Sequence, residues 1–122
     1  MRRMLTGILA ALVLALGAHA AAAAGLQRVI IVQPTDVAAY LKEIDTLRGL
    51  FKKAGVTVTL KVWRARFAAA EAGTIVVTEE VADLATLARL DDLQKSNPDI
   101  AATMGRIGKI RKITSDSLYE GL

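Results

Sequence analysis

The 122-residue chain has no cysteine and a single histidine, His19. Without cysteine it cannot form disulfides, thiolate zinc sites or iron–sulfur clusters, and it has neither a cysteine nucleophile nor a lipid-anchor cysteine. Aromatic residues make up only 4% of the chain. Because proteins that bind single-stranded nucleic acids stack bases on several aromatic side chains, we expect no nucleic-acid partner.

The N-terminal segment has the three parts of a secretory signal peptide. Arg2 and Arg3 give it a positive start, residues 5–16 form an uncharged apolar run, and a string of alanines follows. Small residues at the required spacing place cleavage after Ala24, with Ala20 as the alternative. A retained membrane helix is the competing interpretation, since residues 5–26 approach the ~20 apolar residues of a span. Alanine is only weakly hydrophobic, so we favour export, with residues 1–24 as signal peptide.

Removal of this segment leaves residues 25–122, which we expect to form one domain, periplasmic or extracellular, with no stable membrane anchor. The loss of Arg2 and Arg3 lowers the net charge from +4 to +2. His19 is lost as well, so the mature chain has no histidine for a catalytic triad, a haem ligand or a common zinc site. We therefore expect no cofactor and no metal.

Hydrophobic periodicity divides the mature chain into strands and helices. Residues 26–33 are apolar and β-branched, which predicts a buried strand, and residues 56–67 and 74–81 predict a looped hairpin. Apolar residues three and four apart predict helices over 37–54 and 82–95. Asn97 and Pro98 favour a short third helix that ends at Gly105 and Gly108, and residues 109–119 form a last extended segment.

This order predicts an α+β, ferredoxin-like β-α-β-β-α-β domain, with a four-stranded antiparallel sheet and helices on one face. The other face is then left uncovered. In residues 56–67 the valines and Leu60 share one side, while Lys61 and Trp63 lie on the opposite side with two threonines. An exposed face of this mixed kind often marks a subunit or ligand contact, so we expect a homodimer.

Lys61, Trp63 and Glu80 are the candidate pocket residues on this face. Lys61 is two residues from Trp63, and Glu80 belongs to the corresponding side of the neighbouring strand. A lysine near an acid can hold an anionic or polar head group, or donate a proton if burial shifts its pKa, while Trp63 packs on an apolar body. Trp63 also suits an interface or core position, and Glu80 a solvated strand end. No residue is identified as catalytic.

Four segments resemble small proteins of the dimeric α/β-barrel superfamily, which includes antibiotic-biosynthesis monooxygenase and NIPSNAP-like domains. They are VWRARF at 62–67, AGT at 72–74, Glu79-Glu80, and SDSLY at 115–119. The resemblance implies two sheets that face each other in a homodimer and enclose a pocket. Haem-degrading relatives use a histidine ligand that the mature chain lacks. Cofactor-independent oxygenase relatives surround the substrate with polar groups that are scarce here, and both departures weigh against those activities.

These observations favour an exported dimer that binds a small apolar or anionic metabolite between its sheets. The alternative is a cofactor-independent enzyme, monooxygenase-like or isomerase-like, that uses the same pocket.

N-terminal sequencing of the protein from producing cells tests the export prediction. We expect a mature chain that starts at Gly25, or at Ala21 if the alternative site is used, because the apolar run ends well before both positions. An intact Met1 in a membrane fraction would contradict it.

Overall fold

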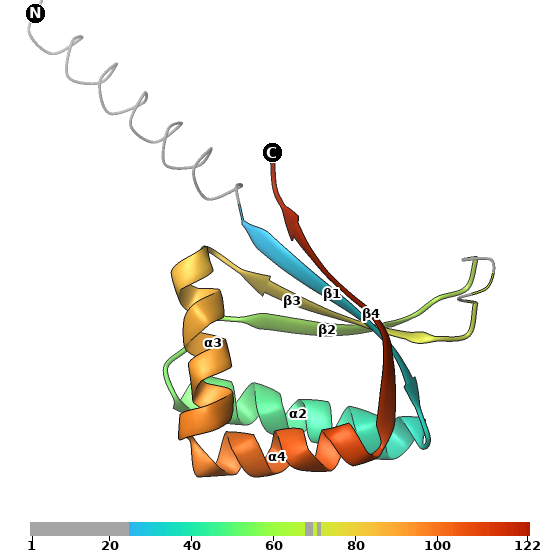
Figure 1. Cartoon of the computed structure of the whole chain (residues 1–122), viewed down its shortest axis with the longest axis horizontal. Helices are drawn as coiled ribbons and strands as arrows, with labels where there is room; N and C mark the ends of the chain where they lie inside the picture. Colours follow the sequence, from blue (N-terminus) through green and yellow to red (C-terminus); the bar gives the residue numbers. More distant parts are fainter. Residues whose placement is uncertain (1–24, 68–69, 71) are drawn as a thin grey trace, which may run out of the picture.

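The computed structural model describes residues 25–67, 70 and 72–122; the signal peptide predicted for residues 1–24 lies outside them. The described residues form four strands in one layer and three helices, which lie on one side of that layer (Figure 1). In chain order the elements are β1 (Leu26–Pro34), α2 (Val37–Lys53), β2 (Thr59–Arg64), β3 (Ile75–Val81), α3 (Leu84–Ser96), α4 (Pro98–Lys109) and β4 (Arg111–Glu120).

The sheet has the strand order β2-β3-β1-β4, and every neighbouring pair is antiparallel. This is the predicted ferredoxin-like arrangement, with α4 added between α3 and the last strand. A register shift at Ile31 and Val32 interrupts the pairing of β1 with β4. There the hydroxyl of Thr114 donates a hydrogen bond to the carbonyl of Ile31 at 3.2 Å.

Side-chain caps determine where the helices begin. Asp36 accepts a hydrogen bond from the backbone N–H of Ala39, and α2 ends before Gly55, whose positive φ of 75° suits a residue without a Cβ. Asn97 serves two helices: its backbone N–H donates to Leu93 at the end of α3, and its side chain accepts from the backbone at the start of α4. One residue therefore makes the corner between α3 and α4.

Two boundaries differ from the sequence-based expectation. The strand expected over residues 56–67 is confined to Thr59–Arg64. The third helix was expected to end at Gly105 and Gly108, but α4 continues through both to Lys109. Glycine costs a helix only about 1 kcal/mol relative to alanine, and burial of Ile107 in the core offsets that cost.

The core lies between the sheet and the helices and draws on all of them. Its most fully buried side chains are Val32, Tyr40, Phe51, Leu90, Ile100, Thr103 and Ile107. Among the residues that the structure describes, no helix combines the length and the apolar character needed to cross a bilayer.

The apolar residues three and four apart on α2 include one buried and one partly exposed leucine, and these two leucines allow a matched test of the packing. Leu47 is buried and Leu41, on the same helix, is 39% exposed. We expect Leu47→Ala to lower the free energy of unfolding by about 2–5 kcal/mol, because it leaves a cavity, and Leu41→Ala by about 1 kcal/mol. Urea denaturation of the two variants measures both values, and equal losses would contradict the observed burial.

Candidate functional site

The sheet face away from the helices carries the three residues that the sequence singled out. Strand pairing arranges twelve side chains of this open face in three rows that run from β2 across β3 and β1 to β4. The Trp63 row is Trp63, Val76, Ile31 and Ser115; the Lys61 row is Lys61, Thr78, Val29 and Ser117; the Glu80 row is Thr59, Glu80, Gln27 and Tyr119.

Polarity increases from one row to the next. The Trp63 row is apolar except for its β4 member, the Lys61 row is mixed, and every side chain of the Glu80 row bears a polar group. The face therefore offers an apolar surface at one end and hydrogen-bonding groups at the other.

Trp63 is fixed to the neighbouring strand by its polar edge. Its indole Nε1 donates a hydrogen bond to the Oγ1 of Thr78 at 3.1 Å, yet the residue is 53% exposed. A tryptophan with a satisfied N–H and a free ring surface is suited to packing on a second apolar surface.

The structure brings Lys61 and Glu80 together. The Nζ of Lys61 lies 3.6 Å from Oε1 of Glu80, and the Nε2 of Gln27 donates to the same oxygen at 3.4 Å. The two charged side chains are 48% and 42% exposed, so the single chain does not desolvate the lysine. As expected for neighbours on a strand, Glu79 points to the other face.

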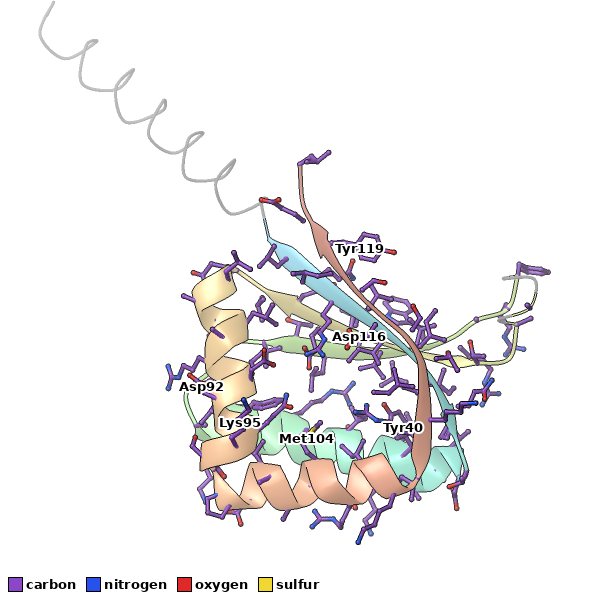
Figure 2. All side chains as sticks on the ribbon, viewed as in Figure 1. Tyr40, Asp92, Lys95, Met104, Asp116 and Tyr119 are labelled. Carbon is purple, nitrogen blue, oxygen red and sulfur yellow. The ribbon has the colours of Figure 1, made fainter. Side chains whose placement is uncertain are left out.

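A hollow of about 500 Å³ adjoins the Glu80 row, and all four members of that row line it. Tyr119 on β4 projects away from the helices at this end (Figure 2). The polar end of the face is thus concave, and its donors and acceptors come from all four strands.

A second polar cluster, on the covered face, was not found from the sequence. The guanidinium of Arg28 on β1 binds Asp116 on β4 through two hydrogen bonds, Nε to Oδ1 at 2.9 Å and Nη2 to Oδ2 at 2.7 Å. Its Nη1 lies 3.8 Å from Oε2 of Glu79 and 3.7 Å from Oδ1 of Asp91 on α3. In the sequence, the one signal for this cluster was Arg28, a charged residue inside the apolar run of residues 26–33.

Burial and pairing move the pKa values of this cluster in opposite directions. Burial raises the pKa of Glu79, partly offset by the charge of Arg28, whereas the hydrogen bonds from Arg28 lower the pKa of Asp116. The same pairing raises the pKa of Arg28. Of Glu79 and Asp116, Glu79 is therefore the carboxyl that takes up a proton first as the pH falls.

In the part of the chain that the structure describes, no group of three or more acidic side chains is arranged to hold a metal ion.

The raised pKa of Glu79 makes stability fall as the pH rises. The folded chain keeps this proton at pH values above 4.5, the ordinary pKa, where the unfolded chain has lost it. We expect Glu79→Gln to remove this contribution. The free energy of unfolding of the variant, relative to that of the parent, should therefore increase as the pH rises from below 4.5 toward neutrality.

Urea denaturation across this range measures the difference. The control Glu80→Gln removes the neighbouring carboxylate from the open face and should stay within about 1 kcal/mol of the parent, because exposed ion pairs contribute little. A difference between Glu79→Gln and the parent that does not change with pH would contradict the buried acid.

No protein-family model matches the sequence, and no curated protein matches it. Solved structures do match the fold. A conserved protein of unknown function from Bacteroides thetaiotaomicron, described as a possible oxidoreductase, is 13% identical with a TM-score of 0.51, covering 81% of this chain and 99% of its own. A conserved protein from Methanosarcina mazei is 12% identical with a TM-score of 0.53, covering 85% and 99%.

A third structure is a dimeric protein of unknown function with a ferredoxin-like fold, from Bacteroides fragilis. It is 14% identical, with a TM-score of 0.50, over 79% of this chain and 95% of its own. At these identities the likeness concerns the fold alone, and it agrees with the strand order and the helices on one face: the chain has a ferredoxin-like fold.

Proposed function

We propose that the protein is an exported homodimer that binds a small molecule with an apolar body and an anionic or polar head group against its open sheet face. The polarity gradient across the three rows carries this proposal. A ligand of that kind would lay its body on the Trp63 row and its head group in the hollow beside the Glu80 row.

The exposure of Trp63 at one end of the open face supports the homodimer. Trp63 is exposed to solvent and the two β-branched residues beside it, Ile31 and Val76, are half-buried, with no described helix over them. A second copy of the same face would bury them, and the neighbour from Bacteroides fragilis is described as dimeric. This arrangement is also the one implied by the resemblance to antibiotic-biosynthesis monooxygenase and NIPSNAP-like domains, in which two sheets enclose a pocket.

Lys61 is the residue that would recognise an anionic head group. Its distance of 3.6 Å to Glu80 exceeds that of a hydrogen bond, so its ammonium keeps three donors for a ligand. Glu80 and Gln27 add an acceptor and a donor beside it. Closure of a second sheet would strengthen each of these contacts by excluding water.

A cofactor-independent enzyme in the same pocket is the alternative, favoured by the contact between Lys61 and Glu80. A second sheet would bury this pair, and burial lowers the pKa of a lysine toward values useful for proton transfer. One structural neighbour is described as a possible oxidoreductase, a description that belongs to that protein.

Native mass spectrometry of the protein purified from producing cells tests assembly and ligand together. We expect the mass of two mature chains plus a retained small molecule. Trp63 is the only tryptophan, so its emission reports directly on the open face and should shift to the blue as the dimer forms. A monomeric mass at micromolar concentration, with unshifted emission, would contradict the dimer.

The variant Lys61→Met distinguishes ligand binding from enzymatic turnover. For a binding protein, the variant should remain dimeric and retain about tenfold less ligand, because one charge-assisted contact is lost. The matched control is Lys42→Met, an exposed position on α2, which should retain the ligand fully. Turnover of the retained molecule by the parent, abolished in Lys61→Met, would replace binding with the enzymatic alternative.

A further inference from the structure

A small, partly open cavity of about 100 Å³ lies between the sheet and the helices, on the opposite side of the sheet from the open face. Its polar lining consists of Arg28, Glu79, Gln94 and Arg111, and the remaining lining side chains are apolar. Met104 is one of these, and Figure 2 shows it with Tyr40 in the layer between the helices and the sheet. The cavity is therefore a polar pocket inside the core layer.

Glu79 leaves one carboxylate oxygen without a hydrogen bond in this pocket. The residue is only 8% exposed, and its Oε2 is buried with no hydrogen-bond partner among the described residues. The nearest charged partner of that oxygen, Nη1 of Arg28, is 3.8 Å away. A buried carboxylate oxygen without a hydrogen bond is costly, and a proton on Glu79 that is donated to an acceptor in the cavity would remove that cost.

Arg111 supplies a positive charge in the same cavity as Glu79. It lines the same cavity, its Nη1 donates to the hydroxyl of Tyr40 at 3.2 Å, and it forms no ion pair with any residue that the structure describes. Arg28 differs, because Asp116 occupies it through two hydrogen bonds. The cavity thus contains one arginine that a carboxylate has already neutralised and one that none has.

We propose that this cavity is a second binding site, which takes a short-chain organic carboxylate between Arg111 and the carboxyl of Glu79. The ligand's carboxylate would accept from the guanidinium fork of Arg111 and from the O–H of Glu79, and Gln94 offers a further amide. The volume of about 100 Å³ admits only a small ligand, on the order of six non-hydrogen atoms. Partly exposed Arg28 and Ile113 form the side through which it would enter.

Binding at this site is coupled to a proton on Glu79, whose pKa is raised by burial and by the charges of Asp91 and Asp116 and lowered by those of Arg28 and Arg111. The elements packed around Glu79 present these charged or titratable groups to it: Arg28 from β1, Tyr40 from α2, Asp91 from α3, and Arg111 and Asp116 from β4. From β2 and α4 come Leu60 and Met104, which do not titrate. Because the proton must be present for Glu79 to donate, affinity should rise as the pH falls.

Pyruvate is a suitable probe because it has six non-hydrogen atoms and its own carboxyl stays ionised over the range used. We expect calorimetric binding by the purified protein that is several-fold tighter at about pH 5.5 than at about pH 7.5. Pyruvamide, the neutral analogue of the same shape, should bind about tenfold more weakly. In ¹⁵N–¹H spectra, the side-chain amide of Gln94 should shift while the emission of Trp63 stays constant, which separates this site from the open face.

Arg111→Met should weaken pyruvate binding about tenfold or more. Lys112→Met is the matched control, since it removes the adjacent charge from an exposed position and should change affinity less than about twofold. Glu79→Gln gives a second test that does not depend on the fold of the arginine variant. Its amide donates at every pH, so pyruvate binding should persist and lose its pH dependence.

Three outcomes would overturn the proposal. One is the absence of pyruvate binding at either pH. Another is binding that moves Trp63 emission and leaves Gln94 unchanged, which would place pyruvate on the open face. The third is an experimental structure with pyruvate in which the cavity holds water only. Failure of the dimer or of ligand retention at Lys61 would leave this site unaffected, because its residues lie on the covered face of the sheet and on the helices that pack against it.

Discussion

The pairing of β1 with β3 on one side and β4 on the other is the constraint on which the rest of the structure depends. β1 is the strand through which β4 joins the sheet, and its register decides which side chains meet on each face. Because side chains alternate along a strand, a single step separates Arg28, which faces the helices, from Gln27, which faces away. A slip of one residue would exchange the two faces.

On the covered face this register places charge inside an apolar layer. Arg28 is directly opposite Glu79 and reaches Asp116 on the other neighbouring strand, so one guanidinium connects three strands. The two carboxylates interact with Arg28 differently. Asp116 accepts two hydrogen bonds from the guanidinium, whereas Glu79 forms only an ion pair with it, at 3.8 Å and without a hydrogen bond. A buried carboxylate without a hydrogen bond is costly, and proteins keep such groups where they serve a purpose beyond stability. In the binding site proposed beside Glu79 and Arg111, that purpose would be the recognition of a carboxylate.

On the open face the same register produces a surface with graded polarity. The charged side chains on this face, Lys61 and Glu80, are both partly exposed, so their ion pair is weak in the single chain. The two faces therefore differ in how far they desolvate their polar groups. The covered face packs its polar groups against the helices of the same chain, whereas the open face leaves Lys61 and Glu80 in contact with water.

Sequence patterns were sufficient for the element order and for the side of each strand. Periods of two and 3.6 residues are local properties, which is why the ferredoxin-like order, the α2 stripe and the shared side of Lys61 and Trp63 were predictable. The end of α4 was not, because burial of Ile107 overrides the local preference of its glycines.

The meeting of Lys61 with Glu80 could be expected once adjacent strands were assumed, but the partners of Arg28 could not. Asp116 lies 88 residues away along the chain, and only the register of β1 with β4 brings the two together. The sequence by itself therefore determined which residues form strands and helices and which face each side chain takes, since both follow from local periodicity. Only the tertiary structure decided which charges pair across strands and that Glu79 and Arg111 share a cavity, because such contacts depend on register and packing between distant segments.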